Sequence, residues 1–389
     1  MSEFIPLSVP SIRGNEWKYI KECLDTEWVS SVGKYVNKFE ENVCSLCGSK
    51  YAIACVNGTA ALEIALKLAG VTENDEVIVP TLTFIASINV VRYCRAEPIF
   101  MDCDDYYCLD VEKTIEFIKS QTKFKNGYTY NSITGKRIAA LVPVHVFGNA
   151  VNLAELLELC HQRNIIVIED AAESIGTYYT DTNLKGCFTG TVGTIGCFSF
   201  NGNKIITTGG GGMIITNDKL IANRARYLTT QAKDDELRFI HNEIGYNYRL
   251  TNIQAAMGVA QLEKLKEYID IKQENYQIYK NQIDKIDGLN LAPVPDYAVV
   301  NYWMYCLQID KKIYGRDRES LMALLTNKKI QTRPIWYLNH LQKPYRNCQS
   351  YRIEKAPRLL DITLNIPCSV NLSRTQIDQV CEALKNGRK

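Results

Sequence analysis

Short apolar runs alternate with stretches of helical periodicity through about residue 250 of the chain. The first unit combines an apolar run at residues 51–56, a turn at 57–59 and a helical pattern at 60–69, which predicts strand, turn and helix. Further strands are expected at the apolar runs 76–79, 98–101, 138–144 and 165–168. Because these runs are continuous rather than alternating, they predict strands that are buried on both faces, as in a mostly parallel sheet.

The pattern changes near Thr251, which we interpret as a domain boundary. A long helical stretch runs from residue 252 to about 286, and a loop follows at 288–295. The remaining elements are shorter, and they suit a small α+β domain. We therefore expect a large domain at residues 1–250 and a smaller one at 251–389 that includes the linking helix, in line with the usual division of chains of this length.

Composition and charge limit the range of partners. Hydrophobic residues make up 46% of the chain and charged residues 23%, which is ordinary globular usage. The 45 lysines and arginines nearly balance the 43 aspartates and glutamates, so we expect a small-molecule partner and neither nucleic acid nor membrane. No stretch of sequence reaches the roughly 18 apolar residues of a membrane span, and the start lacks the pattern of a secretory signal. We therefore expect a cytoplasmic protein.

Cysteines and histidines give no sign of a disulfide framework or a metal site. The fourteen cysteines are scattered through apparent strands and helices, so we interpret them as reduced core thiols. Cys44 and Cys47 form one CxxC, but no second pair follows at zinc-finger spacing. The chain has four histidines and no HExxH, and we interpret His145 as a core residue.

Three segments carry candidate chemistry. Residues 57–61, Asn-Gly-Thr-Ala-Ala, begin a helix whose backbone N–H groups could bind a phosphate, although an ordinary turn with an N-cap fits equally. Asp170 follows an apolar strand at the sheet edge where open α/β folds bind ligands, and a helix cap is the alternative. Lys204 lies between a strand end and four glycines at 209–212, where an imine-forming lysine or a surface loop lysine could stand. Neither GxGxxG nor GxxxxGK[ST] occurs, which argues against a dinucleotide site or a P-loop.

Together, five stretches resemble the DegT/DnrJ/EryC1/StrS family of sugar aminotransferases over nearly the whole chain. They are residues 57–62, 80–86, 169–172, 198–204 and 245–250. The resemblance implies an α/β fold of fold type I, aspartate aminotransferase-like, in which a large domain with a mostly parallel seven-stranded sheet joins a smaller α+β C-terminal domain. It also implies pyridoxal 5′-phosphate as cofactor and a homodimer with shared active sites. Residues 201–208 and 230–232 are most similar to the transaminases of bacillosamine and legionaminic acid biosynthesis, which act on UDP-linked 4-keto-6-deoxy sugars.

The resemblance also implies a role for each matching residue. Lys204 would be the Schiff-base lysine, and Asp170 would pair with the pyridine nitrogen of the cofactor. The remaining implied cofactor contacts are Gly58, Thr59, Ala60 and Ser199 at the phosphate, Phe84 on the ring, Glu173 near the ring hydroxyl, and Asn247 at the phosphate of the neighbouring subunit's cofactor. By sequence alone, a core position fits Phe84 better. Glu173 departs from the glutamine or histidine common in the family, and Gly210 from a common acid.

The implied reaction moves an amino group from L-glutamate to C4 of a nucleotide-linked 4-keto-6-deoxy sugar, with Lys204 as general acid and base. The implied sugar contacts are Trp28, Val29, Ser30, Arg333 and Trp336. C3 amination and a GDP- or dTDP-linked sugar stay open. A sugar dehydratase is disfavoured because such relatives carry histidine in place of the lysine. Intact Lys204 and Asp170 also disfavour a regulatory protein without catalysis, and the missing glycine motif disfavours a nicotinamide oxidoreductase.

Overall fold

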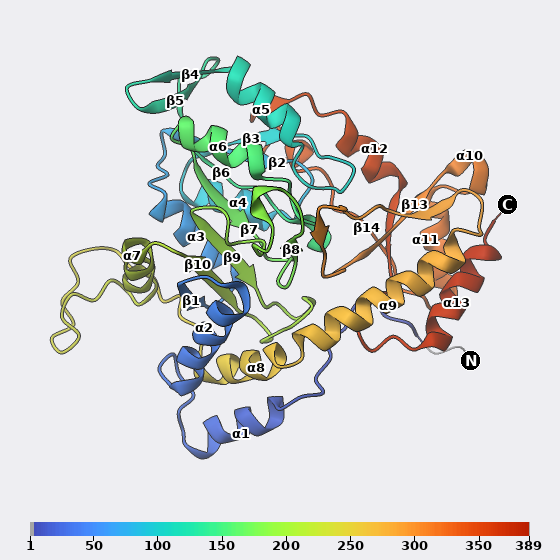
Figure 1. Ribbon diagram of the computed structural model, residues 1–389, viewed down its shortest axis with the longest axis horizontal. Coiled ribbons are helices and arrows are strands. Elements are labelled where there is room, and N and C mark those ends of the chain that lie inside the picture. The colour runs from blue at the N-terminus through green and yellow to red at the C-terminus, as the bar shows by residue number, and fades with distance from the viewer. Residues whose placement is uncertain (1–3, 389) are drawn as a thin grey trace.

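The computed structural model describes residues 4–388, and a ten-stranded sheet lies at its centre (Figure 1). Its middle has the strand order β1-β10-β9-β7-β6-β2-β3. These strands are β1 (Tyr51–Cys55), β2 (Asp75–Pro80), β3 (Glu97–Met101), β6 (Arg137–Leu141), β7 (Ile166–Asp170), β9 (Ile195–Ser199) and β10 (Gly212–Thr216). β10 is antiparallel to both of its neighbours, and the remaining adjacent pairs are parallel. This confirms the predicted seven-stranded, mostly parallel sheet.

Three short strands that the sequence did not predict extend this sheet. β4 (Thr122–Lys125) and β5 (Tyr128–Asn131) form a hairpin beside β6. β15 (Ser350–Tyr351) is parallel to β3 and brings the late part of the chain back to the main sheet. None of these strands exceeds four residues, so their sequences carry too little periodicity to distinguish them from loops.

Helices cover both faces of the main sheet. Successive strand residues point to opposite sides, and the apolar strands therefore present apolar side chains to helices on each face. Ile53 and Ile214 pack with the apolar side chains of α3 (Gly58–Leu68), α4 (Ala86–Tyr93) and α7 (Lys219–Thr229) on one face. Ala52 and Met213, one residue earlier, pack on the opposite face. That second face is covered by α2 (Lys34–Cys47), α5 (Val111–Ser120), α6 (Ala154–Gln162) and α8 (Asn252–Leu262). Burial on both faces explains the unbroken apolar runs.

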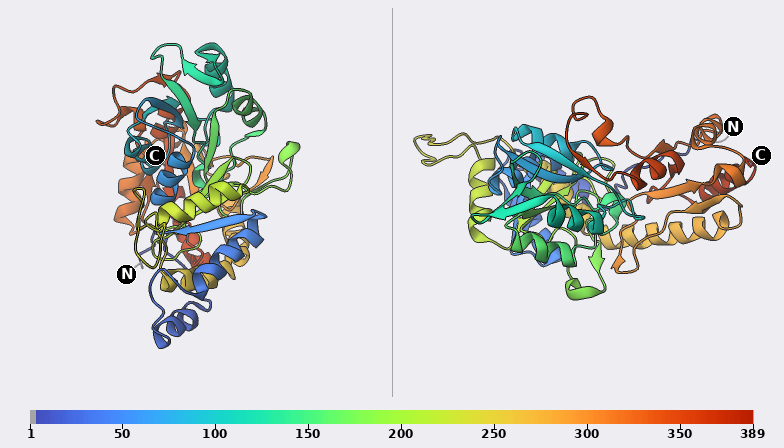
Figure 2. Two further views of the ribbon diagram at one scale, coloured as in Figure 1. Left: turned by 90° about the vertical axis from the view of Figure 1, so that its left-hand side faces the viewer. Right: turned by 90° about the horizontal axis from the view of Figure 1, so that it is seen from above.

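A second, antiparallel sheet lies to one side of the main sheet (Figure 2). Its strands, in order, are β11 (Leu289–Leu291), β13 (Tyr305–Ile309), β16 (Thr363–Ile366) and β14 (Arg333–Pro334). It packs with α9 (Leu265–Ile283), α10 (Lys311–Tyr314), α11 (Arg318–Asn327) and α13 (Arg374–Lys385) around a separate apolar core. We call this sheet and these helices the small unit; the domain limits 1–250 and 251–389 stay a prediction.

The long helical stretch after Thr251 is two helices rather than the single linking helix that the sequence suggested. Thr251 and Gln254 form a capping box at the start of α8, which packs against α1 (Glu16–Asp25) and α2. α9 then begins at Leu265 and leads to the small unit (Figure 1). The break follows the packing, because α8 is buried beside the main sheet whereas α9 has one charged, exposed side.

The remaining elements connect the two sheets. β8 (Tyr178–Tyr179) and β12 (Ala298–Val299) form a two-stranded ladder, and α12 (Lys355–Ile362) follows β15. The short 3₁₀ turns are η1 (Val146–Gly148), η2 (Thr182–Leu184) and η3 (Asn339–Leu341). All fourteen cysteines are free thiols, and most are buried. Between residues 4 and 388, no helix combines the length and apolar character needed to cross a membrane.

Candidate active site

A pocket of about 320 Å³ lies at the carboxyl ends of β7 and β9. Open α/β sheets bind ligands at this edge. The lining includes eight of the residues singled out from the sequence: Gly58, Thr59, Phe84, Asp170, Glu173, Ser199, Lys204 and Trp336. The fold therefore joins segments from both ends of the chain around one cavity.

The start of α3 forms one wall of this pocket. Asn57 caps the helix, since its side-chain oxygen accepts a hydrogen bond from the Ala60 N–H at 2.8 Å. Ala60 therefore has its donor satisfied within the chain, and it is absent from the pocket lining. A Cβ on Gly58 would come within 2.9 Å of the Ser199 Cβ, so only glycine allows this close approach. The backbone at Gly58 and Thr59, beside the Ser199 hydroxyl, suits an anion such as phosphate.

Asp170 ends β7 and is almost completely buried. Its carboxylate accepts hydrogen bonds from the Ser87 hydroxyl at 2.6 Å and from the Ala172 N–H at 3.0 Å. Burial raises the pKa of Asp170, while these donors and the nearby Lys204 charge oppose that rise. A buried carboxylate needs a charged partner, and a protonated ring nitrogen in the pocket would supply one.

Lys204 projects into the pocket from the turn after β9. Its Nζ lies 3.5 Å from Oε1 of Glu173 and 4.1 Å from the ring centroid of Trp303. The second Glu173 oxygen accepts the Phe147 N–H at 2.8 Å. Burial raises the pKa of Glu173 to about 7, although the Lys204 charge lowers it. The amine is therefore held between a carboxylate and an aromatic face.

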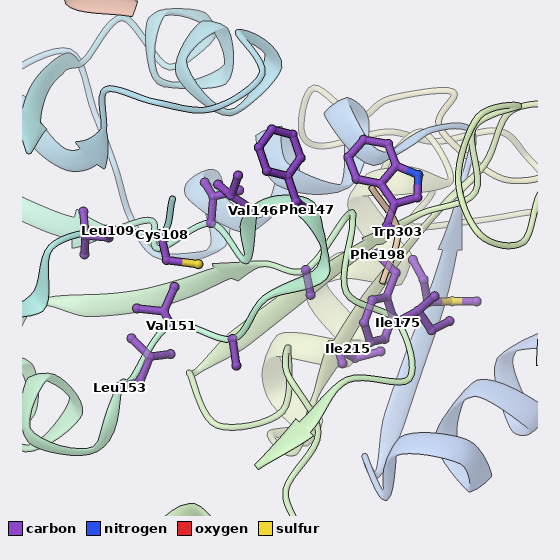
Figure 3. Packing of buried hydrophobic residues seen from close by; sticks show 14 of the residues in the cluster. Cys108, Leu109, Val146, Phe147, Val151, Leu153, Ile175, Phe198, Ile215 and Trp303 are labelled. Carbon is purple, nitrogen blue, oxygen red and sulfur yellow. The ribbon is translucent and has the colours of Figure 1, made fainter. Parts of the chain in front are cut away.

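Aromatic side chains form the outer wall. Phe147 stacks on Trp336 with ring centroids 4.7 Å apart, and Trp303 lies 6.4 Å from the same ring. Figure 3 shows Phe147 and Trp303 side by side at the edge of the buried cluster. Phe84 lies 6.4 Å from Trp336, and 53% of its surface is exposed. A flat aromatic ligand fits between such surfaces.

The sequence did not point to Ser87, Phe147, Asn203 or Trp303, although each lines the pocket or contacts a residue that does. Asn203 stands next to Lys204, and only its position there could have marked it. Trp303 lies two residues before β13, in the part of the chain that we assigned to the small domain, and no local pattern places such a residue beside Lys204. Its role depends on how the small unit packs against the main sheet.

Five further predicted site residues do not line this pocket in a single chain. Trp28 lines a separate cavity of about 290 Å³ between α1, α2 and α8, and Val29 and Ser30 beside it are exposed. Arg333 is exposed on β14. Asn247 is exposed opposite Thr230, at the base of a loop that projects from the body (Figure 1). These five residues could take part in the site only if a bound ligand extended to them or if a second copy of the chain brought them to its pocket.

The pocket fits pyridoxal phosphate on three counts. The Lys204 amine can form an imine with an aldehyde, the buried Asp170 can hold a proton on a ring nitrogen, and the start of α3 can bind a phosphate. Among residues 4–388, no cluster of three or more metal-binding side chains is present. The fold and site together define a pyridoxal-phosphate-dependent transferase of fold type I.

Comparisons with known proteins agree with this class. The sequence model of the DegT/DnrJ/EryC1/StrS aminotransferase family matches residues 10–385, so the chain belongs to this family. GDP-perosamine synthase of Escherichia coli O157:H7 is 38% identical over 98% of each chain. GDP-perosamine synthase of Caulobacter vibrioides is 37% identical over 98% of this chain and 97% of its own. The crystal structure of DesI in the presence of its TDP-sugar product has a TM-score of 0.87 and 25% identity, covering 99% of this chain and 93% of DesI.

The protein is therefore a pyridoxal-phosphate-dependent sugar aminotransferase of nucleotide-sugar biosynthesis. This confirms the family, the enzyme class and the cofactor expected from the sequence. The position of Lys204 in the pocket also argues against a sugar dehydratase, in which histidine replaces the lysine.

Proposed function

We propose that the enzyme moves an amino group from L-glutamate to C4 of a nucleotide-linked 4-keto-6-deoxy sugar. The observation that carries the proposal is the convergence of the Lys204 amine and the Asp170 carboxylate on one pocket, beside the start of α3. The same pocket must accept glutamate and sugar in turn, since the amino group passes from one to the other through the site.

Each residue has a defined task in this proposal. Bound pyridoxal phosphate supplies an aldehyde that takes up amines and a ring that withdraws electrons. The Lys204 amine takes a proton from the α-carbon of glutamate, and in the second stage it delivers a proton to C4 of the sugar. Asp170 holds the proton on the ring nitrogen. The backbone of Gly58 and Thr59 binds the phosphate.

We also propose that the complete site needs two copies of the chain. Asn247 would reach the phosphate site of the partner, and the projecting loop at residues 233–244 would lie against it. Support comes from the apolar side chains on this loop, because Leu237 and Ile244 are 81% and 82% exposed in one chain. Apolar surface of this kind is typical of an interface between subunits.

The nucleotide and the sugar are proposed on two lines of support. The relatives named GDP-perosamine synthase span nearly the whole chain at 37–38% identity, which favours a GDP-linked sugar. The similarity of residues 201–208 to UDP-sugar transaminases favours a UDP-linked sugar instead. We give GDP preference because its support extends over the whole length of the chain. Trp336 lines the pocket and is our first candidate for a sugar contact.

A substrate panel tests the proposal. The purified holoenzyme should show visible absorbance that borohydride removes, and Lys204→Ala should lose the borohydride-sensitive band. With L-glutamate, the enzyme is then given GDP-, UDP- and dTDP-linked 4-keto-6-deoxy sugars and a 3-keto analogue. We expect the GDP-linked sugar to turn over fastest, and product mass with the sugar proton couplings will identify the aminated carbon. Turnover of the 3-keto sugar alone would contradict C4 transfer.

A further inference from the structure

The Lys204 amine contacts two side chains that together enclose it. Oε1 of Glu173 lies 3.5 Å from Nζ, and the ring centroid of Trp303 lies 4.1 Å from the same atom. Each wall has a further hydrogen bond, and on the Glu173 side the second carboxylate oxygen accepts the Phe147 N–H at 2.8 Å. The Trp303 indole N–H donates to the Asn203 carbonyl at 2.7 Å and so also fixes the turn that presents the lysine.

Asn301 joins the two walls of this enclosure. It is fully buried, and its amide nitrogen donates to the carbonyls of Glu173 at 2.9 Å and Ile175 at 3.0 Å. Its side-chain oxygen accepts a hydrogen bond from the backbone N–H of Trp303 at 3.0 Å. The turn that contains Gly148 lies against this oxygen. Gly148 has a φ of +90°, and a Cβ at this position would come within 1.9 Å of the Asn301 oxygen, so only glycine leaves room for the Asn301 side chain. The spacing between carboxylate and ring is therefore set by buried contacts.

We propose that Glu173 and the Trp303 ring form a seat that holds the Lys204 amine whenever it is not bonded to the cofactor, and that Asn301 fixes the geometry of this seat. The inference rests on the function proposed above, in which the lysine is released and rebonded in each stage. Glu173 and Trp303 are positioning residues in this proposal, because they act through the Lys204 amine that they contact. The carboxylate and the ring face both favour the charged amine.

The seat provides a place for the proton that the amine must lose before it can act as a base. Oε1 of Glu173 is the carboxylate oxygen within reach of this proton, 3.5 Å from Nζ. Glu173 also interacts electrostatically with Asp170 at the end of β7 and with the thiols of Cys108 and Cys306. Burial raises the pKa of both thiols well above the usual value, so they stay neutral. Glu173 is thus the carboxylate in contact with the amine.

The test measures the reactivity of the released lysine. Excess L-glutamate converts the holoenzyme to its amine form, which the absorbance change verifies, and limiting acetic anhydride then labels the lysines for peptide mass spectrometry. Lys266, whose side chain is 88% exposed, is the internal reference. Near pH 7 we expect Lys204 to label about tenfold faster in Glu173→Gln and about threefold faster in Trp303→Leu, because each variant removes one of the two contacts that hold the amine. Trp17→Leu, a surface change, should leave the ratio unaltered.

Two features separate this seat from a simple opening of the pocket. At high pH the Lys204 labelling rates of native enzyme and variants should converge, because the amine is then neutral in all of them. Trp303→Phe, which keeps an aromatic face, should restore most of the protection lost in Trp303→Leu. A Lys204 rate unchanged near pH 7 in both Glu173→Gln and Trp303→Leu, or raised equally at every pH, would overturn the seat. Failure of glutamate to change the absorbance would instead refute the proposed function.

Discussion

The carboxylates of Glu169 and Asp170, adjacent at the end of β7, have different partners. Asp170 faces the pocket and accepts hydrogen bonds from the Ser87 hydroxyl and the Ala172 N–H. Glu169 accepts the backbone N–H groups of Gly190, Val192 and Gly193 and lies 2.9 Å from Nε2 of His145. Consecutive strand residues point to opposite faces, so two neighbours in sequence supply a site residue and a structural residue. The two should respond differently to the same kind of substitution.

Asp170→Asn should abolish most of the chemistry and leave the fold intact. An amide cannot balance the charge of a protonated ring nitrogen, whereas it can still bond the Ser87 hydroxyl. We expect kcat to fall about 100-fold or more, with an unchanged urea midpoint for the protein without cofactor. Steady-state kinetics and urea unfolding measure the two effects. A variant with native kcat would show that Asp170 does not serve the ring nitrogen.

Glu169→Gln should have the opposite result. The two Glu169 oxygens accept hydrogen bonds from the backbone N–H groups of Gly190 and Val192. In glutamine an NH₂ group replaces one of these oxygens, so a buried N–H donor loses its acceptor. We expect the free energy of unfolding to fall by about 2–4 kcal/mol, while the folded fraction keeps its kcat. Urea unfolding gives the first quantity. Glu267→Gln, on the exposed side of α9, is the matched control and should change the free energy of unfolding little.

Asp102 should make stability depend on pH in the acid range. It lies 2.7 Å from the Lys113 amine, and its carboxylate accepts three N–H groups at the start of α12. Burial alone would raise the pKa of Asp102, but Lys113 and these donors outweigh burial and lower it. A lowered pKa stabilises the fold above the unfolded-state value, and this is lost as pH falls through the folded-state value. Asp102→Asn should therefore cost about 1–3 kcal/mol at pH 7, and urea unfolding should show a smaller difference from native as the pH is lowered.

Glu173 should give stability the opposite dependence on pH from Asp102. Burial raises its pKa to about 7, so the unfolded chain loses this proton at lower pH than the native one. Native stability should then decline as pH rises from the usual glutamate value toward 7, by about 2–4 kcal/mol. Glu173→Gln has no such proton to lose, so its thermal midpoint should decline less over this range. Equal declines in both proteins would show that Glu173 is ionised throughout.

Mixing two inactive variants tests the shared site. Lys204→Ala and Asn247→Ala each damage both sites of their own dimer, whereas a mixed dimer has one site with both native residues. After co-refolding in equal amounts, about a quarter of all sites should be native, if subunits combine at random. Activity is compared with the sum of the two variants refolded separately. No gain over that sum would mean that Asn247 serves its own chain or no site.

The main sheet was predictable because its signal is local. The strand runs of β1, β2 and β7 are buried on both faces, so each appears in the sequence as a continuous apolar segment. Asp170 stood out locally because it comes directly after an apolar run at the expected sheet edge. The role of Lys204 came from the family resemblance, because a surface loop lysine also fits its local sequence. The helix start at Gly58 has a local signature as well, although the capping of Ala60 by Asn57 has to be seen in the structure.

The outer wall of the site was not predictable in this way. Trp303 reaches Lys204, and Trp336 stacks on Phe147, because the small unit packs over the end of the main sheet. Such contacts depend on tertiary packing and leave no periodic trace in the sequence. The division between α8 and α9 also reflects what each helix packs against. The sequence between α8 and α9 contains neither proline nor glycine, so it carries no helix-breaking signal at this point.

The pairing of β15 with β3 affects how the chain is made. β3 is complete at Met101, whereas its outer neighbour begins at Ser350. On the ribosome, that edge of β3 stays open while the intervening chain emerges at about 5–20 residues per second. An open edge can accept strands from other molecules. The two residues of this edge that β15 covers, Phe100 and Met101, therefore stay open to such pairing until the last stretch of synthesis.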